Sequence, residues 1–443
     1  MEEQASKNPF TNRENIFMEI EIQDSPKKKL TPSGRGGEGA FKKSQRVVSL
    51  DVFRGFTVAL MIFVDHLGGI LPVISHSPWN GVNLADFVVP FFLFIVGVAI
   101  ALMYKRLPNK CVATKAALLR TLKLIILGLI LQGGYFHGIN DLTYGVDFKR
   151  IRFMGTLQRI AIAYIFTALC EIWFKGDREV DSELSLLVKY QFHWIAGFVI
   201  TVIYLSLLYG LYVPDWEYQI PSGGSSSSSS SSVTKTFLVK CGVRGDTGPA
   251  CNAVGMIDRK ILGINHLYIR PTFARTKQCS VKSPRYGPLP PDAPPWCQAP
   301  FDPEGLLGSI MAIVTCLIGL HYGHVIVHFR GHKERILNWT IPAVSLLVIG
   351  IVLDCLGIHG NKNLYSFSYM CNTTSAAGVL FIAFYAPVDV FGYRWPTKGL
   401  EWMGKHALMI YILLGCNLLP TLLQGFYWEN PQNNFLRLIG IKT

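Results

Sequence analysis

Residues 84–104 read LADFVVPFFLFIVGVAIALMY, and Asp86 is the one charged residue among them. A helix needs about 20 mostly apolar residues to cross a hydrocarbon core of about 30 Å, and this stretch is long and apolar enough. Further apolar runs occupy residues 52–70, 116–135, 153–174, 193–213, 305–329, 339–356, 365–386 and 400–423. We therefore predict an all-α fold, a polytopic transmembrane helical bundle of about nine to ten spans.

The composition of the whole chain supports a membrane protein. Hydrophobic residues make up 50% of the 443 residues and charged residues 16%, whereas soluble globular domains have about 25% charged residues. The 42 Lys+Arg exceed the 29 Asp+Glu and give a net charge of +13. In an apolar chain such an excess is typical of cytoplasmic loops. We therefore expect a lipid bilayer, and no nucleic acid, as a partner.

The positions of the basic residues predict the topology. Lys and Arg gather before the first span, between the second and third, and between the sixth and seventh, which places the N-terminus in the cytoplasm. We expect residues 1–46 to be a disordered cytoplasmic tail and 47–213 to form the first five transmembrane helices with the loop that carries the candidate site. Residues 214–304 then form one long lumenal loop with a poly-Ser spacer, and 305–443 the remaining transmembrane helices.

The long loop contains four cysteines, Cys241, Cys251, Cys279 and Cys297. On a non-cytoplasmic face they would form two disulfides, for which three pairings exist. Zinc binding is the competing interpretation, but no C-x-x-C spacing is present. We predict disulfides and leave the pairing open.

One predicted membrane face combines imidazoles with carboxylates. Asp65, His66, His76 and Asp86 lie within 22 residues, and Asn80 belongs to the turn between them. A lone interfacial histidine is usually structural, whereas a histidine beside a carboxylate is suited to proton transfer because the carboxylate can fix its tautomer. Both interpretations stay open from the residues alone.

Other polar residues fall within predicted spans. Asp51 and Arg54 share a helix face three residues apart, which is typical either of an ion pair or of an anion site at the cytoplasmic mouth. Arg159 lies inside an apolar stretch and needs a partner or a bound anion. Three histidines share a face of the sixth span without a neighbouring carboxylate, His321, His324 and His328. We expect these histidines to make helix contacts and expect no metal site.

Several motifs in a fixed order resemble one known family. They are LDVFRG at 50–55, MIFVD at 61–65, HSPWNG at 76–81, ADFVVPFF at 85–92, RFMGTLQR at 152–159, IDR at 257–259, DPEGLLG at 302–308 and NKNLYS at 361–366. Over about residues 46–425 the chain resembles the heparan-alpha-glucosaminide N-acetyltransferase family. The poly-Ser loop and the absence of a long lumenal domain before the core look like a plant-type relative.

The resemblance implies an enzyme that uses cytosolic acetyl-CoA to acetylate a terminal glucosamine-like amino sugar in a lumen. The active histidine of the family falls on His76. The family's nearby asparagine falls on Asp65, which could orient His76 or hold the incoming ammonium instead of donating to an oxyanion. The resemblance also implies an endomembrane location, in a lysosome or vacuole, with a second copy of the chain as a candidate partner.

The predicted depth of each polar residue in the membrane suggests whether it binds the donor or the acceptor. The phosphates of CoA need cationic partners near the cytoplasmic mouth, where the topology places Arg54, Arg120 and Lys123. Arg159 would line the passage between the two sites. We expect Asn80, Asp86 and Asp258 to bind the acceptor beside His76.

The competing hypothesis is a transporter of a small anionic or sugar solute without chemistry, because intramembrane charges also line solute paths. The sequence shows none of the inverted repeats that many transporters carry.

The topology is tested by protease protection of sealed microsomes. Protease added outside should remove the first 46 residues and spare the long loop, because that loop faces the lumen in the predicted topology. Cleavage of the poly-Ser run without detergent would contradict this orientation.

Overall fold

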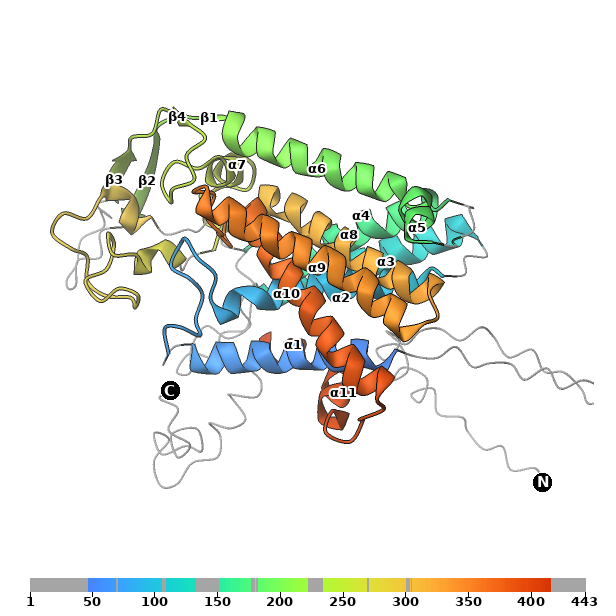
Figure 1. Ribbon diagram of the computed structural model, residues 1–443. Helices are drawn as coiled ribbons and strands as arrows, with labels where there is room; N and C mark the ends of the chain where they lie inside the picture. Colours follow the sequence, from blue (N-terminus) through green and yellow to red (C-terminus); the bar gives the residue numbers. More distant parts are fainter. Residues whose placement is uncertain are drawn as a thin grey trace, which may run out of the picture. The chain divides into compact units, whose positions relative to one another are not determined.

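The computed structural model describes residues 47–68, 71–105, 109–132, 151–176, 180, 182–221, 234–268, 271–299, 303 and 305–415 (Figure 1). The predicted tail 1–46, the poly-Ser spacer and the end of the ninth span lie outside the described residues.

The described residues are mostly helical. The longer helices are α1 (Val48–Leu67), α2 (Val88–Met103), α3 (Lys110–Gln132), α4 (Thr156–Trp173), α6 (Gln191–Gly210), α8 (Leu306–His328), α9 (His332–Cys355) and α10 (Phe367–Tyr385). Each of the first eight apolar runs coincides with one of them, because a helix satisfies its own backbone hydrogen bonds where no water is available. The shorter helices are α5 (Glu183–Lys189), α7 (Ala253–Ile261), α11 (Lys398–Lys405) and α12 (Ala407–Gly415).

Five helical segments of the described residues are long and apolar enough to cross a membrane by length and composition. They are Leu84–Met103, Gln191–Gly210, Leu306–His328, His332–Cys355 and Phe367–Val390. A helical membrane protein is thereby supported, while the number of nine to ten crossings stays a prediction.

The ninth apolar run, residues 400–423, begins as two short helices, and whether it crosses the membrane stays a prediction. α11 ends at Lys405, and α12 begins at Ala407 after a break at His406. Lys405 donates to Glu401 one turn earlier, at 2.6 Å, so a charged pair occupies the helix end before the apolar residues begin. Interruption of the run by Lys405 and His406 is the physical reason for two short helices.

The segment after α6 also shows that a purely helical fold is too simple a prediction. β1 (Tyr212–Val213) pairs antiparallel with β4 (Val243–Arg244), and β2 (Trp216–Pro221) pairs antiparallel with β3 (Thr234–Val239). Aromatic residues favour such pairing, and the rings of Tyr218 and Phe237 stack across the second pair at 5.3 Å. These strands and α7 gather at the end of α6 (Figure 1).

Two disulfides close parts of this segment, as predicted. Cys241 pairs with Cys251, and Cys279 pairs with Cys297. The zinc interpretation of these four cysteines is therefore wrong.

The centre of the core is the contact between α2 and α8, in which glycines let the two backbones touch. A Cβ atom at Gly97 would overlap the carbonyl oxygen of Cys316, and one at Gly319 would overlap that of Phe94. Small residues of this kind allow close helix packing in membranes. Around them, the rings of Phe94 and Tyr322 pack edge to face at 4.8 Å.

A second glycine contact joins α1 to α11, which lie beside one another in Figure 1. A Cβ atom at Gly55 would overlap the carbonyl oxygen of Leu400, and one at Gly404 would overlap that of Asp51. The helix that carries Arg54 is therefore held against the chain's last described helices.

We expect Gly319→Ala to destabilise the protein, because the added methyl group must push α2 away from α8. Overpacking of this kind costs about 1–3 kcal/mol, which should appear as a lower thermal midpoint in detergent. The matched control is Gly399→Ala in α11, where an added Cβ atom meets nothing within 4 Å. Equal midpoints for the two variants would contradict the close contact.

Candidate active site

His76 lies in the turn between α1 and the short 3-10 helix η1 (Leu84–Phe87). The turn is fixed from within, since the Ser77 hydroxyl donates to the backbone oxygen of Asn80 at 2.7 Å. It is also fixed from outside, since the buried Trp79 indole donates to the backbone oxygen of Thr247 at 3.0 Å. The Ser-Pro-Trp-Asn-Gly sequence thus forms an anchored turn that presents His76.

The imidazole of His76 is hydrogen-bonded to Asp86, with 2.7 Å between Nδ1 and Oδ1. The other carboxylate oxygen of Asp86 accepts the backbone N–H groups of Ser77, at 3.1 Å, and Asn83, at 2.9 Å. The Asp86 side chain is 0% exposed. Because an ionised carboxylate only accepts, Nδ1 is assigned the proton, which leaves Nε2 as the basic atom.

Nε2 of His76 has no hydrogen-bond partner within the described residues, and 37% of the side chain is exposed. Burial of the ring lowers the pKa of His76 below its usual 6.5, the nearby Lys362 ammonium lowers it further, and the hydrogen bond to Asp86 opposes these effects. The lowered pKa favours the neutral imidazole, which is the form able to accept a proton.

Aromatic residues connect this pair to the interior of the helical protein. The Tyr369 hydroxyl donates to the backbone oxygen of Asp86. The Tyr365 ring lies edge-on against that of Tyr369 at 5.1 Å, and the Arg159 guanidinium lies over the Tyr365 ring at 5.6 Å. Arg159, near the start of α4, is 7% exposed. It is thus a buried cation at the His76 end of the helices.

Asp65 lies in the last turns of α1, with an exposed side chain. It lies within electrostatic range of Lys362, as His76 does. Among the described residues the orienting contact to His76 comes from Asp86, and no hydrogen bond joins Asp65 to His76. The positive charge of Lys362 thus acts on both Asp65 and His76.

The three residues predicted to bind the acceptor, Asn80, Asp86 and Asp258, have different surroundings. Asn80 is exposed in the His76 turn, and its side-chain oxygen accepts from the Asn361 amide at 3.4 Å. Asp86 has its carboxylate fully engaged by the protein. Asp258, in α7, instead caps the start of α8, accepting the N–H groups of Gly305 at 2.9 Å and Leu306 at 3.0 Å.

Asp258 is 0% exposed, and burial raises its pKa to about 6. The two backbone hydrogen bonds and the charge of Arg159 limit this rise. The geometry gives Asp258 a helix-capping role, and its predicted contact with the acceptor stays a prediction.

The residues predicted to bind CoA lie away from His76. Arg54 pairs with Asp51 at 3.4 Å near the start of α1. Arg120 reaches Met103, the last residue of α2, and Lys123 is exposed on α3. Asp86 precedes α2, and Met103 is its last residue. At about 1.5 Å per residue, Asp86 and Met103 are therefore about 25 Å apart along the helix.

One histidine of α8, His324, has a carboxylate partner that the sequence did not reveal. His324 Nε2 lies 2.8 Å from Glu171 Oε2, and His193 Nε2 lies 3.4 Å from the same oxygen. The Tyr190 ring stacks on His324 at 3.5 Å. Within the described residues no group of three or more His, Cys, Asp or Glu is arranged to hold a metal ion.

Sequence reasoning missed two cations near His76. Lys362 belongs to the NKNLYS motif, so its motif position was a usable signal. Arg275, in the 3-10 helix η3 (Thr272–Arg275), donates to the backbone oxygen of His76 and, at 2.9 Å, to the Ser75 hydroxyl. Nothing local in the sequence indicated that contact, since 199 residues separate Arg275 from His76.

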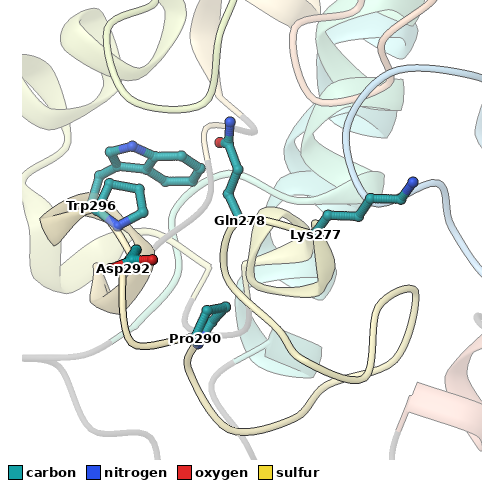
Figure 2. A pocket seen from close by; sticks show the side chains of 6 residues that line it. Lys277, Gln278, Pro290, Asp292 and Trp296 are labelled. Carbon is teal, nitrogen blue, oxygen red and sulfur yellow. The ribbon is translucent and has the colours of Figure 1, made fainter.

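A pocket of about 550 Å³ lies on the segment closed by the second disulfide (Figure 2). Its lining residues are Lys277, Gln278, Pro290, Asp292, Pro294 and Trp296. None of them belongs to the His76 turn, so the pocket is separate from the hydrogen-bonded pair of His76 and Asp86.

Comparison with known proteins agrees with the motifs. Residues 46–177 match the family described as heparan-alpha-glucosaminide N-acetyltransferase, catalytic. The chain is 29% identical over 390 residues to the heparan-alpha-glucosaminide N-acetyltransferase of Homo sapiens, covering 83% of this chain and 52% of the human protein. It is 29% identical over 392 residues to that of Mus musculus, covering 83% and 53%. The chain thus spans about half the length of the curated relatives it matches, and the resemblance is confirmed.

We expect the imidazole of His76 to titrate at a lower pH in the folded protein than in the unfolded chain. Diethyl pyrocarbonate modifies only the neutral imidazole, so the pH dependence of His76 modification, followed by mass spectrometry, measures its pKa. The midpoint should lie below that of a synthetic peptide of residues 71–83, which titrates near the ordinary value of about 6.5. A midpoint at or above that of the peptide would contradict the electrostatics described here.

The same shift has a consequence for stability. The unfolded chain binds a proton at His76 more readily than the folded chain does, so acid favours unfolding through this group. The contribution of His76 is fully present above about pH 6.5 and is lost as the pH falls through the lowered pKa.

Proposed function

We propose that the protein is an integral membrane N-acetyltransferase. In this proposal it takes the acetyl group of acetyl-CoA from the cytosolic side and transfers it to an amino-sugar acceptor on the lumenal side. The observation that carries the proposal is His76, with Nδ1 held by a buried carboxylate and Nε2 open. It lies inside the segment that matches the catalytic region of the named N-acetyltransferases. A lysosomal or vacuolar membrane is the proposed location.

The chemistry needs a base of near-neutral pKa. An amine attacks the thioester carbonyl carbon only when it is unprotonated, and Nε2 of His76 would accept the proton that the amine loses. The new C–N bond forms as the C–S bond breaks. The imidazolium, stabilised by Asp86, then returns the proton to the sulfur of CoA.

The charges around His76 suit the two reactants. The Asp65 carboxylate would hold the acceptor as an ammonium ion before deprotonation, and the exposed Asn80 amide would meet sugar hydroxyls. Lys362, close to both Asp65 and His76, would stabilise the negative charge that develops on the thioester oxygen. An asparagine donor at position 65 is not required in this arrangement.

The donor would enter from the opposite end of the helices. Arg54, Arg120 and Lys123 would bind the phosphates of CoA by charge-assisted hydrogen bonds. The pantetheine arm would then extend toward His76, because about 25 Å separates the two ends of α2. Arg159, buried at the His76 end, would line the inner part of this passage.

We expect His76→Ala to lower acetyl transfer by about 10²–10⁴-fold, the usual effect of removing a positioned base. Acetyl-CoA binding should survive, since the phosphates bind at the far end. The complementary variant is Arg54→Ala, which should weaken acetyl-CoA binding about 10–100-fold through loss of a charged hydrogen bond of about 1.5–3 kcal/mol. Turnover of radiolabelled acetyl-CoA and equilibrium binding in detergent measure the two effects.

His66→Ala is the matched control, because Nδ1 of His66 bonds to the oxygen of Ile62 within its own helix at 2.9 Å. Its effect on transfer should be milder. If His66→Ala abolishes transfer and His76→Ala does not, the base is His66. If the wild-type protein transfers no acetyl group but moves a labelled solute across vesicles, the transporter hypothesis replaces this one.

A further inference from the structure

Two parts of the chain that are far away in sequence, both in the disulfide-bonded segment, form hydrogen bonds with the turn that presents His76. Thr247, which accepts the hydrogen bond from Trp79, lies between the bonded Cys241 and Cys251. Arg275, which donates to His76 and Ser75, lies four residues before the bonded Cys279. The segment therefore contacts the backbone around the candidate base, whereas Asp86 contacts its imidazole ring.

We propose that Arg275 is a positioning residue for acetyl transfer: its guanidinium fixes the backbone of His76, and so the place of the imidazole, from the disulfide-bonded segment. This inference rests on the proposed function, because it assigns Arg275 a role in the same reaction. Arg275 does not touch the reactants in this assignment, and it acts through His76.

The geometry of the guanidinium suits this task. One nitrogen donates to the His76 carbonyl oxygen and the other, at 2.9 Å, to the Ser75 hydroxyl. A planar fork of this kind fixes direction as well as distance, which the single ammonium of lysine does not. Arg275 is 8% exposed, so water competes little for these contacts.

Arg275 is itself held in place from several sides. Its backbone oxygen accepts from the Ser283 hydroxyl at 2.9 Å, and its guanidinium lies over the Tyr286 ring at 5.6 Å. At the start of η3, Thr272 accepts from the Asn363 amide at 2.7 Å. Asn363 follows Lys362 in the chain, so this hydrogen bond joins η3 to the segment that carries the second cation.

Aromatic packing joins the same segment to the turn. The Phe273 ring contacts Trp79 at 6.4 Å and Trp296 at 5.6 Å. Trp296 precedes the bonded Cys297. The disulfide therefore limits how far η3 can move from the His76 turn. Arg275, at the end of η3, is held at the same distance from His76.

Arg275 also acts on the charge of His76. Its positive charge is one of the influences that lower the pKa of His76, so removal of the guanidinium charge should raise that pKa. A residue that only supported the fold would leave the acid limb of the pH profile unchanged.

Two variants separate position from charge. Arg275→Gln should lower kcat by about 10–100-fold, the scale of a small displacement of a reacting group, and should move the acid limb of kcat/KM to higher pH. Arg275→Lys keeps the charge but loses the fork, so kcat should fall while the acid limb stays. Acetyl-CoA binding should be unchanged in both variants.

A double-variant cycle tests whether Arg275 acts through His76. His76→Ala with Arg275→Gln should transfer acetyl no more slowly than His76→Ala alone, because residues that act as a unit are not additive. The matched control is Lys277→Gln, an exposed cation two residues further along, which should leave kcat and the pH profile as in the wild type. Additive losses in the cycle, or wild-type kinetics in Arg275→Gln, would overturn the proposal.

Modification of His76 by diethyl pyrocarbonate separates failure of this inference from failure of the proposed function. It needs no turnover, and it reports the titration of His76 in wild type and variants alike. If the wild type transfers no acetyl group, a higher midpoint in Arg275→Gln still supports the contact with His76, and an unchanged midpoint overturns it. The thermal midpoint of each variant shows whether it folds. If Arg275→Gln does not fold, the fall in kcat is measured on Arg275→Lys instead.

Discussion

The carboxylate of Asp86 is the point at which the helices and the candidate site meet. It is buried, and it accepts hydrogen bonds from His76 and from the backbone of Ser77 and Asn83. A buried charge that lost these donors would cost several kcal/mol. The turn must therefore fold around Asp86, and since Asp86 directly precedes α2, the imidazole is fixed relative to the core.

The core in turn fixes the separation of the two ends of α2, where the two reactants would bind in the proposed function. Glycines bring α2 and α8 into backbone contact, at a separation that a side chain at either glycine would not allow. His76 and Asp86 lie before α2, while Arg120 reaches the last residue of that helix. A reaction that joins these ends needs a reactant long enough to extend between them, and acetyl-CoA, with phosphates at one end and the thioester at the other, has that character.

Much of the fold follows from local sequence. Eight apolar runs became helices because each can satisfy its backbone hydrogen bonds internally. The pair of His76 and Asp86 was visible as neighbouring residues suited to proton transfer, although the orienting role falls to Asp86 and not to Asp65. The ninth helix broke at His406, where polar residues interrupt the run. The pairing of the four loop cysteines was open until the structure selected one of three.

The sequence by itself indicated which segments are helical and apolar, that the cysteines of the long loop pair as disulfides rather than bind zinc, and that a histidine and carboxylates gather at one end. Only the tertiary structure decided which polar groups meet. Arg275 reaches His76 across 199 residues, and Glu171 meets His324 across 153. The physical reason is that a buried polar group must find a partner, and helix packing, rather than local sequence, determines which partner is within reach.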